Sequence, residues 1–164
     1  MNPEFERIRG YLQEQAASKT IEELITRVEE GVTELEQAGK SVPEPALRTV
    51  PAGEEWSPWQ CISHIIDTNL SVGRQVLYAA HTGELPPREE ASLPDDVEAA
   101  FRQQREAMDS LYAHVRDAQP DAFLDLKWDH PMFGPLNWRE WFIFLRIHCR
   151  DHARQLNAML EAVN

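Results

Sequence analysis

The feature that most limits the fold of this chain is the spacing of its apolar residues. Between about 94 and 117, one face of a helix would carry Val97, Phe101, Gln104, Met108, Leu111 and Val115. This 4-3-4-3-4 spacing matches the period of an α-helix and predicts an amphipathic helix. No segment shows a convincing alternation of apolar and polar residues, so we expect an all-α protein.

Capping signals predict where other helices begin. Three pairs have the spacing of a capping box, in which two side chains bond to each other's backbone N–H: Thr20 with Glu23, Ser57 with Gln60, and Asn137 with Glu140. A short first helix ends near residue 18, although it could form one kinked helix with the second. The other helices are expected over 20–39, 58–81, 94–117 and 137–162.

The segments between these helices are long and rich in proline and glycine. They cover about 39–56, 82–94 and 119–137, and we expect all three to be irregular. Long amphipathic helices with such connections can bury their apolar faces together in a four-helix bundle. The length of 164 residues suits one domain, 1–164, with a single core.

Composition and charge exclude several classes of function. The net charge of −12 opposes binding to nucleic acid. The longest strongly apolar run, at 141–145, is too short to span a membrane, and the first residues lack the apolar region of a signal peptide. The two cysteines, Cys61 and Cys149, are too few for a disulfide scaffold, although a bond between them remains open. We therefore expect a cytoplasmic protein.

Polar residues interrupt the apolar face of the last predicted helix. This face runs through Trp138, Trp141, Leu145, His148, His152, Gln155 and Met159. Burying an unpartnered imidazole costs about 1–3 kcal/mol, so the two histidines need partners. Histidines at i and i+4 can bind one divalent ion, although such a pair also arises by chance in a core.

His64 is the best third ligand in the sequence, because its own helix face carries polar or small residues and resembles the wall of a pocket. The segment "HCRDH" lacks the glutamate of the H-E-x-x-H metalloproteases, which disfavours that class. The remaining histidines have no partner at ligand spacing, and we expect His81 and His114 on the surface and His130 in a turn before the last helix.

Two stretches, "WSPWQCISHIID" and "HPMFGPLNWREWFIFLRIHCRDHARQL", resemble the DinB/YfiT-like superfamily of bacterial helical bundles. The resemblance extends from roughly residue 21 to 160. It implies a four-helix bundle in which His64, His148 and His152 bind one divalent metal, zinc or nickel. Several members of that family are thought to be thiol S-transferases or isomerases that use a low-molecular-weight thiol, and many form dimers.

The predicted metal site favours a metal-dependent transferase, and the resemblance implies that it joins a low-molecular-weight thiol to a small electrophile. Three neutral imidazoles would leave the ion its full charge, so that it acidifies a bound thiol or water. A metal-dependent hydrolase of a small amide or ester is the second hypothesis. The third is a non-catalytic metal-binding module of a stress response. The partner is a small molecule in the first two, and a homodimer remains open.

Five residues could surround this site, each with an alternative. Asp67 and Asp151 could accept a hydrogen bond from a ligand imidazole, or be plain surface carboxylates. Gln155 could line the cavity or bond to a neighbouring group. Cys61 could be a fourth ligand or a redox thiol, but is better explained as a small buried residue. Trp141 could line a substrate pocket or only pack in the core.

Overall fold

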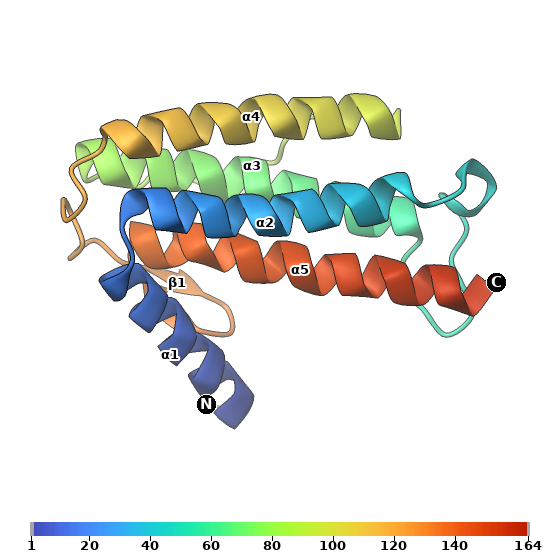
Figure 1. Cartoon of the computed structure of the whole chain (residues 1–164), viewed down its shortest axis with the longest axis horizontal. Helices are drawn as coiled ribbons and strands as arrows, with labels where there is room; N and C mark the ends of the chain where they lie inside the picture. Colours follow the sequence, from blue (N-terminus) through green and yellow to red (C-terminus); the bar gives the residue numbers. More distant parts are fainter. Residues whose placement is uncertain (1, 164) are drawn as a thin grey trace.

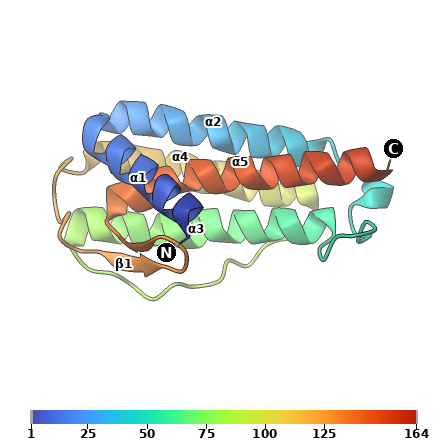
Figure 2. The same cartoon turned by 90° about the horizontal axis from the view of Figure 1, so that it is seen from below.

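The computed structural model describes residues 2–163 and confirms the all-α fold (Figure 1). The helices are α1 (Pro3–Ser18), α2 (Ile21–Lys40), the 3-10 helix η1 (Glu44–Ala46), α3 (Pro58–Thr82), α4 (Val97–Asp117) and α5 (Trp138–Val163). The four long helices α2 to α5 form a bundle in which α5 packs against both α2 and α3, and α4 packs mainly against α3. The short helix α1 crosses α5 on the outside of the bundle (Figure 2).

The expected capping boxes form at the starts of the helices. Both reciprocal hydrogen bonds are present at Thr20 and at Ser57. At α5, the Asn137 side chain accepts from the backbone N–H of Glu140, whose own side chain accepts from the N–H of Asn137. Lys19 is extended, so α1 and α2 are two separate helices.

The segment before α5 is more regular than expected. It contains two short antiparallel strands, β1 (Trp128–His130) and β2 (Gly134–Leu136), in place of a wholly irregular chain. Strands of three residues are too short to show an alternating pattern. Their position depends on distant contacts, because the ring of Trp128 stacks on Trp141 of α5 with centroids 5.4 Å apart.

A glycine allows α2 and α5 to lie close together. A Cβ atom added to Gly31 of α2 would lie 2.9 Å from the backbone oxygen of Arg146 in α5. Arg146 also donates to Glu30 across the same interface at 2.8 Å, and Arg150 donates to Glu34 at 3.2 Å. These contacts fix the rotation of α5, whose opposite side carries His148 and His152.

The polar side of α3 binds the loop that leads to α4. This loop runs along the outside of α3 (Figure 2), and four α3 residues hydrogen-bond to it besides Asp67: Thr68, Ser71, Arg74 and Gln75. Part of the polar face beside His64, interpreted from sequence as a pocket wall, is therefore covered by chain. Each described helix lacks the combination of length and apolar character that crossing a membrane requires.

Candidate metal centre

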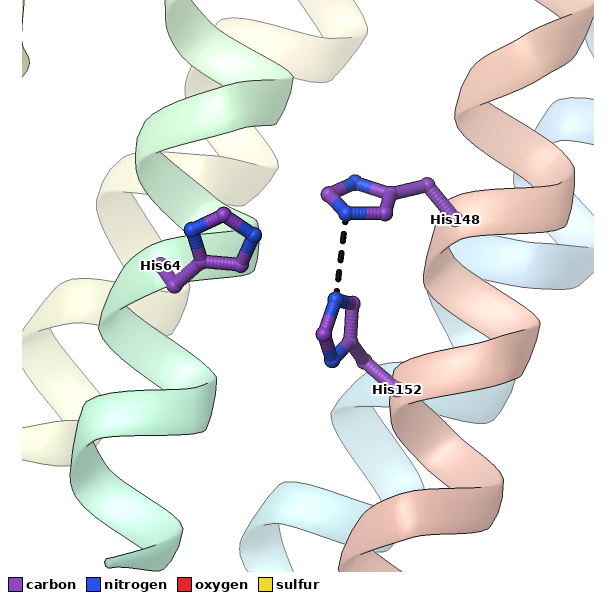
Figure 3. A group of neighbouring side chains, drawn as sticks. All are labelled: His64, His148 and His152. Carbon is purple, nitrogen blue, oxygen red and sulfur yellow. Dashed lines mark hydrogen bonds between the residues drawn. The ribbon is translucent and has the colours of Figure 1, made fainter. Parts of the chain in front are cut away.

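Three histidine side chains from two helices meet in the bundle (Figure 3). His64 comes from α3, and His148 and His152 lie one turn apart on α5. One ring nitrogen of each can be chosen so that all three lie within 4.8 Å of one another, and the Nε2 atoms of His148 and His152 are 3.1 Å apart. The sequence prediction that these three residues converge is thus matched by their geometry.

The spacing of the nitrogens suits a divalent ion. Two nitrogens about 2.0–2.1 Å from one ion, at roughly 90–110° to each other, lie about 2.8–3.4 Å apart. The separation of 3.1 Å between His148 and His152 falls in this range. His64 closes the third side, with its ring 5.3 Å from that of His148 and 5.2 Å from that of His152.

Gln155 determines which nitrogen of His152 faces the cluster. Its Oε1 atom lies 2.8 Å from Nδ1 of His152, so this nitrogen carries the proton and donates. The lone pair of Nε2 is then directed at His148. Nδ1 of His148 is buried without a hydrogen-bond partner, so neither neutral tautomer of this ring satisfies both nitrogens. A cation between the rings would occupy the converging lone pairs.

The surroundings keep all three rings neutral, which is the form that binds metals. Burial lowers the pKa of His148 to about 2, assisted by repulsion from His152 and His64. Burial is also the main cause of the lowered pKa of His64 and of His152. The donor set is therefore three neutral nitrogens, and within residues 2–163 no carboxylate or thiol completes the group.

The two aspartates near the cluster have other partners. Asp67 accepts a hydrogen bond from the backbone N–H of Ala91 at 2.6 Å and so holds the loop after α3. Asp151 is exposed and pairs with Arg154 at 3.2 Å. Neither accepts a hydrogen bond from an imidazole in the described chain, which was one of the two roles considered for them; the observed partner of His152 is the amide of Gln155.

Cys61 lies behind the cluster and not within it. Its sulfur is 3.4 Å from Nδ1 of His152 and donates to Oε1 of Gln155 at 3.5 Å. Burial raises the pKa of this thiol to about 12, and its sulfur is not among the donor atoms that converge in the described chain. Cys149 is also buried, its pKa is likewise raised to about 12 by burial, and both cysteines are free.

Aromatic rings border the cluster on two sides. Trp56, which precedes α3, lies 5.0 Å from the ring of His64 and stacks on His152 at 6.4 Å. On the other side, Trp141 lines a cavity of about 220 Å³ that reaches His64 and His148. Trp141 therefore lines a pocket, which is one of the two roles considered for it from the sequence.

Three residues of this region were not identified as site residues from sequence. Trp56 precedes a predicted helix and His130 is expected in a turn, whereas Arg88 carries no signal in the sequence. His130 and Arg88 line the same cavity as Trp141. Only the folding of the loop and the hairpin back onto the bundle places them there, and no local spacing reveals that.

Comparison with known proteins agrees with the fold. The structure of TT2238, described as a four-helix bundle protein, superposes with a TM-score of 0.60 at 22% identity, covering 85% of this chain and 99% of that one. No curated protein matches the chain. The model of the DinB superfamily matches residues 27–156, a range that includes all three histidines of the cluster. This chain belongs to the DinB superfamily.

Proposed function

We propose that this protein is a metal-dependent transferase that joins a low-molecular-weight thiol to a small electrophile. The observation that carries the proposal is the convergence of three neutral imidazoles beside a small, mainly apolar cavity. Three protein ligands with positions left open are typical of catalytic metal sites, whereas structural sites use four. Zinc and nickel both accept imidazole ligands.

A bound divalent ion would lower the pKa of a thiol or water that reaches it and so supply a nucleophile at neutral pH. The chain provides the rest. His64, His148 and His152 would hold the ion, and Gln155 fixes the ring of His152. The cavity walls align the second substrate, which is the contribution of proximity and orientation.

The cavity favours a thiol over water because it offers no general base. His130 lines it, but its Nδ1 accepts from the backbone N–H groups of Met132 and Phe133, at 3.1 and 3.3 Å. No carboxylate lines this cavity in the described chain. A thiol, with an ordinary pKa of about 8.5, needs far less assistance than water, with about 15.7. Hydrolysis of an amide or ester is therefore the weaker hypothesis.

An assay with 1-chloro-2,4-dinitrobenzene tests the proposal. The thiolate of cysteine or glutathione attacks the chlorinated carbon and forms a C–S bond; chloride leaves with the bonding electrons, and the thiol proton passes to solvent. We expect zinc- or nickel-loaded protein to accelerate this reaction, His148→Ala to abolish the acceleration, and His81→Ala, on the exposed end of α3, to retain it.

The other outcomes identify the rival functions. Metal-dependent release of 4-nitrophenol from 4-nitrophenyl acetate without added thiol, in which water attacks the acetyl carbon and acetate forms, would indicate a hydrolase. Bound metal with no turnover of either kind, including with other cellular thiols, would support a non-catalytic metal-binding module.

A further inference from the structure

The lining of the cavity beside the histidine cluster combines polar and apolar side chains. The rings of His64 and His148 border it, and Arg88 and Thr68 are further polar residues of the lining. The rest of the lining is mostly apolar: Val72, Pro131, Met132, Trp141 and Phe144. Its volume of about 220 Å³ is below the roughly 300–1,000 Å³ of pockets for drug-sized ligands, so the occupant is small.

Arg88 brings the one fixed charge to this lining. Its Nε donates to Oγ of Ser71 at 3.0 Å, and one Nη donates to Oγ1 of Thr68 at 3.2 Å. Both acceptors are neutral hydroxyls on α3, so they orient the guanidinium without neutralising it. The described chain has a large excess of carboxylates, yet none of them forms an ion pair with Arg88.

Arg88 shares this cavity with three imidazole rings. His64 of α3, His130 of β1 and His148 of α5 line it together with Arg88. Arg88 is exposed, so its guanidinium lies at the open side of the cavity, whereas His64 and His148 are partly buried. An anion that enters the cavity would approach the guanidinium beside low-dielectric walls, where attraction between charges is stronger than in water.

His130 adds a neutral donor to the same lining. Because its Nδ1 accepts from two backbone N–H groups of the hairpin, the ring proton is on Nε2. No hydrogen-bond partner of Nε2 is present in the described chain. The ring itself is held firmly, stacked on Phe133 at 4.5 Å and in edge contact with Phe144 at 4.6 Å.

We propose that this cavity binds a small organic carboxylate, which names the chemical class of the electrophile. Arg88 pairs with the carboxylate, and the Nε2–H of His130 is a second donor to an oxygen of the ligand. The apolar part of the ligand packs against Trp141 and Phe144, with its far end toward the histidine cluster. The assignment of the ligand as a substrate rests on the proposed function, but the carboxylate site itself does not.

A matched pair of ligands tests the site directly. Benzoate and benzamide have the same shape, and only benzoate is charged. Binding is titrated on the metal-free protein by the amide and indole shifts in NMR spectra. We expect benzoate to bind at least about tenfold more tightly than benzamide, since a charge-assisted pair is lost with the amide.

Variants assign the preference to the residues. Arg88→Gln should reduce the preference for benzoate to near unity, and Arg88→Lys should restore part of it. Arg74→Gln is the matched control, because Arg74 donates to Pro87 of the same loop at 3.4 Å but does not line the cavity. His130→Asn keeps an acceptor for the hairpin N–H groups, removes the Nε2 donor, and should weaken benzoate about threefold or more.

Equal affinity for benzoate and benzamide, or a preference that survives Arg88→Gln, would overturn the inference. If Arg88→Gln and Arg74→Gln weaken both ligands equally, the arginines only hold the loop and the inference is also wrong. The proposed function can fail separately: a protein that prefers benzoate but binds no metal retains the carboxylate site and loses the transferase.

Discussion

Gln155 lies one turn beyond His152 on α5 and accepts its Nδ1 proton at 2.8 Å, which leaves Nε2 as the nitrogen that faces His148. Gln155 therefore accepts the imidazole hydrogen bond for which the sequence suggested Asp67 or Asp151 as acceptors. An amide oxygen orients the ring without adding negative charge to a site of neutral ligands, so an ion there keeps its acidifying effect.

Replacing Gln155 by leucine should weaken metal binding about 10- to 100-fold, because the ring of His152 loses the acceptor that fixes its tautomer. Gln155→Glu keeps an acceptor and should bind metal at least as tightly as wild type. Competition with a chromophoric chelator measures both affinities. Cys61→Ala, which removes the other side chain bonded to Oε1 of Gln155, is the control and should change affinity little. An unaffected Gln155→Leu variant would show that the contact does not support a metal ligand.

The metal-free protein should lose stability as the pH falls below about 6.5. Burial lowers the pKa of His130 to about 4, against about 6.5 in the unfolded chain. Between these values the unfolded state binds a proton that the folded state does not, so the free energy of unfolding decreases by about 1.4 kcal/mol per pH unit for this histidine. Urea denaturation at several pH values, with a chelator present, measures the slope.

His130→Asn is the comparison for this pH dependence. The free energy of unfolding of this variant should fall less steeply between pH 6 and 4, because its unfolding takes up about one proton fewer. His148 continues to contribute to the slope. Parallel pH profiles for the variant and the wild type would mean that His130 titrates normally in the folded protein.

Replacement by alanine should change the stability of the protein in opposite directions at two glycines. Gly31→Ala places a Cβ 2.9 Å from the Arg146 backbone and should destabilise the protein by about 1–3 kcal/mol through overpacking. Gly10→Ala, in α1 with no atom within 4 Å of the added Cβ, should stabilise it by about 0.5–1 kcal/mol through helix propensity. Thermal unfolding of both variants checks the signs. Similar effects would contradict the close approach of α2 and α5.

Arg105 should matter more to stability than other surface arginines. It donates to Glu29 at 2.8 Å and to Glu36 at 3.1 Å, joining α4 to α2. Arg105→Met should cost about 1–2 kcal/mol, because it leaves two partly buried carboxylates without their cationic partner. Arg116→Met removes a single exposed pair with Glu22 and should change stability by less than about 0.5 kcal/mol. Both variants are measured by chemical denaturation. Equal losses of stability would contradict a larger contribution from Arg105 than from Arg116.

Local signals in the sequence predicted the helices well. Thr20 and Ser57 mark helix starts because the capping box depends on residues three apart, and both boxes form. His148 and His152 were found because two imidazoles on a buried stripe need partners, and His64 because its helix face was unusually polar. Each of these signals lies within one helix.

What could not be predicted depends on chain that folds back from elsewhere. The strands β1 and β2 are three residues each and are positioned by the stacking of Trp128 on Trp141. Arg88 reaches the cavity because Ser71 and Thr68 bind it across 17 and 20 residues. Trp56 lies in the loop before α3 and packs against the rings of His64 and His152. Non-local packing of this kind leaves no periodic trace in the sequence.

The most direct test of the account is the metal content of the purified protein after loading with zinc or nickel and removal of free ion. Elemental analysis should find one ion per chain in the wild type and in His81→Ala, and essentially none in His64→Ala, His148→Ala and His152→Ala, with all variants folded by circular dichroism. A wild-type protein that takes up no stoichiometric ion, or uptake that persists when His148 is replaced, would contradict the central claim that these three imidazoles form a metal site.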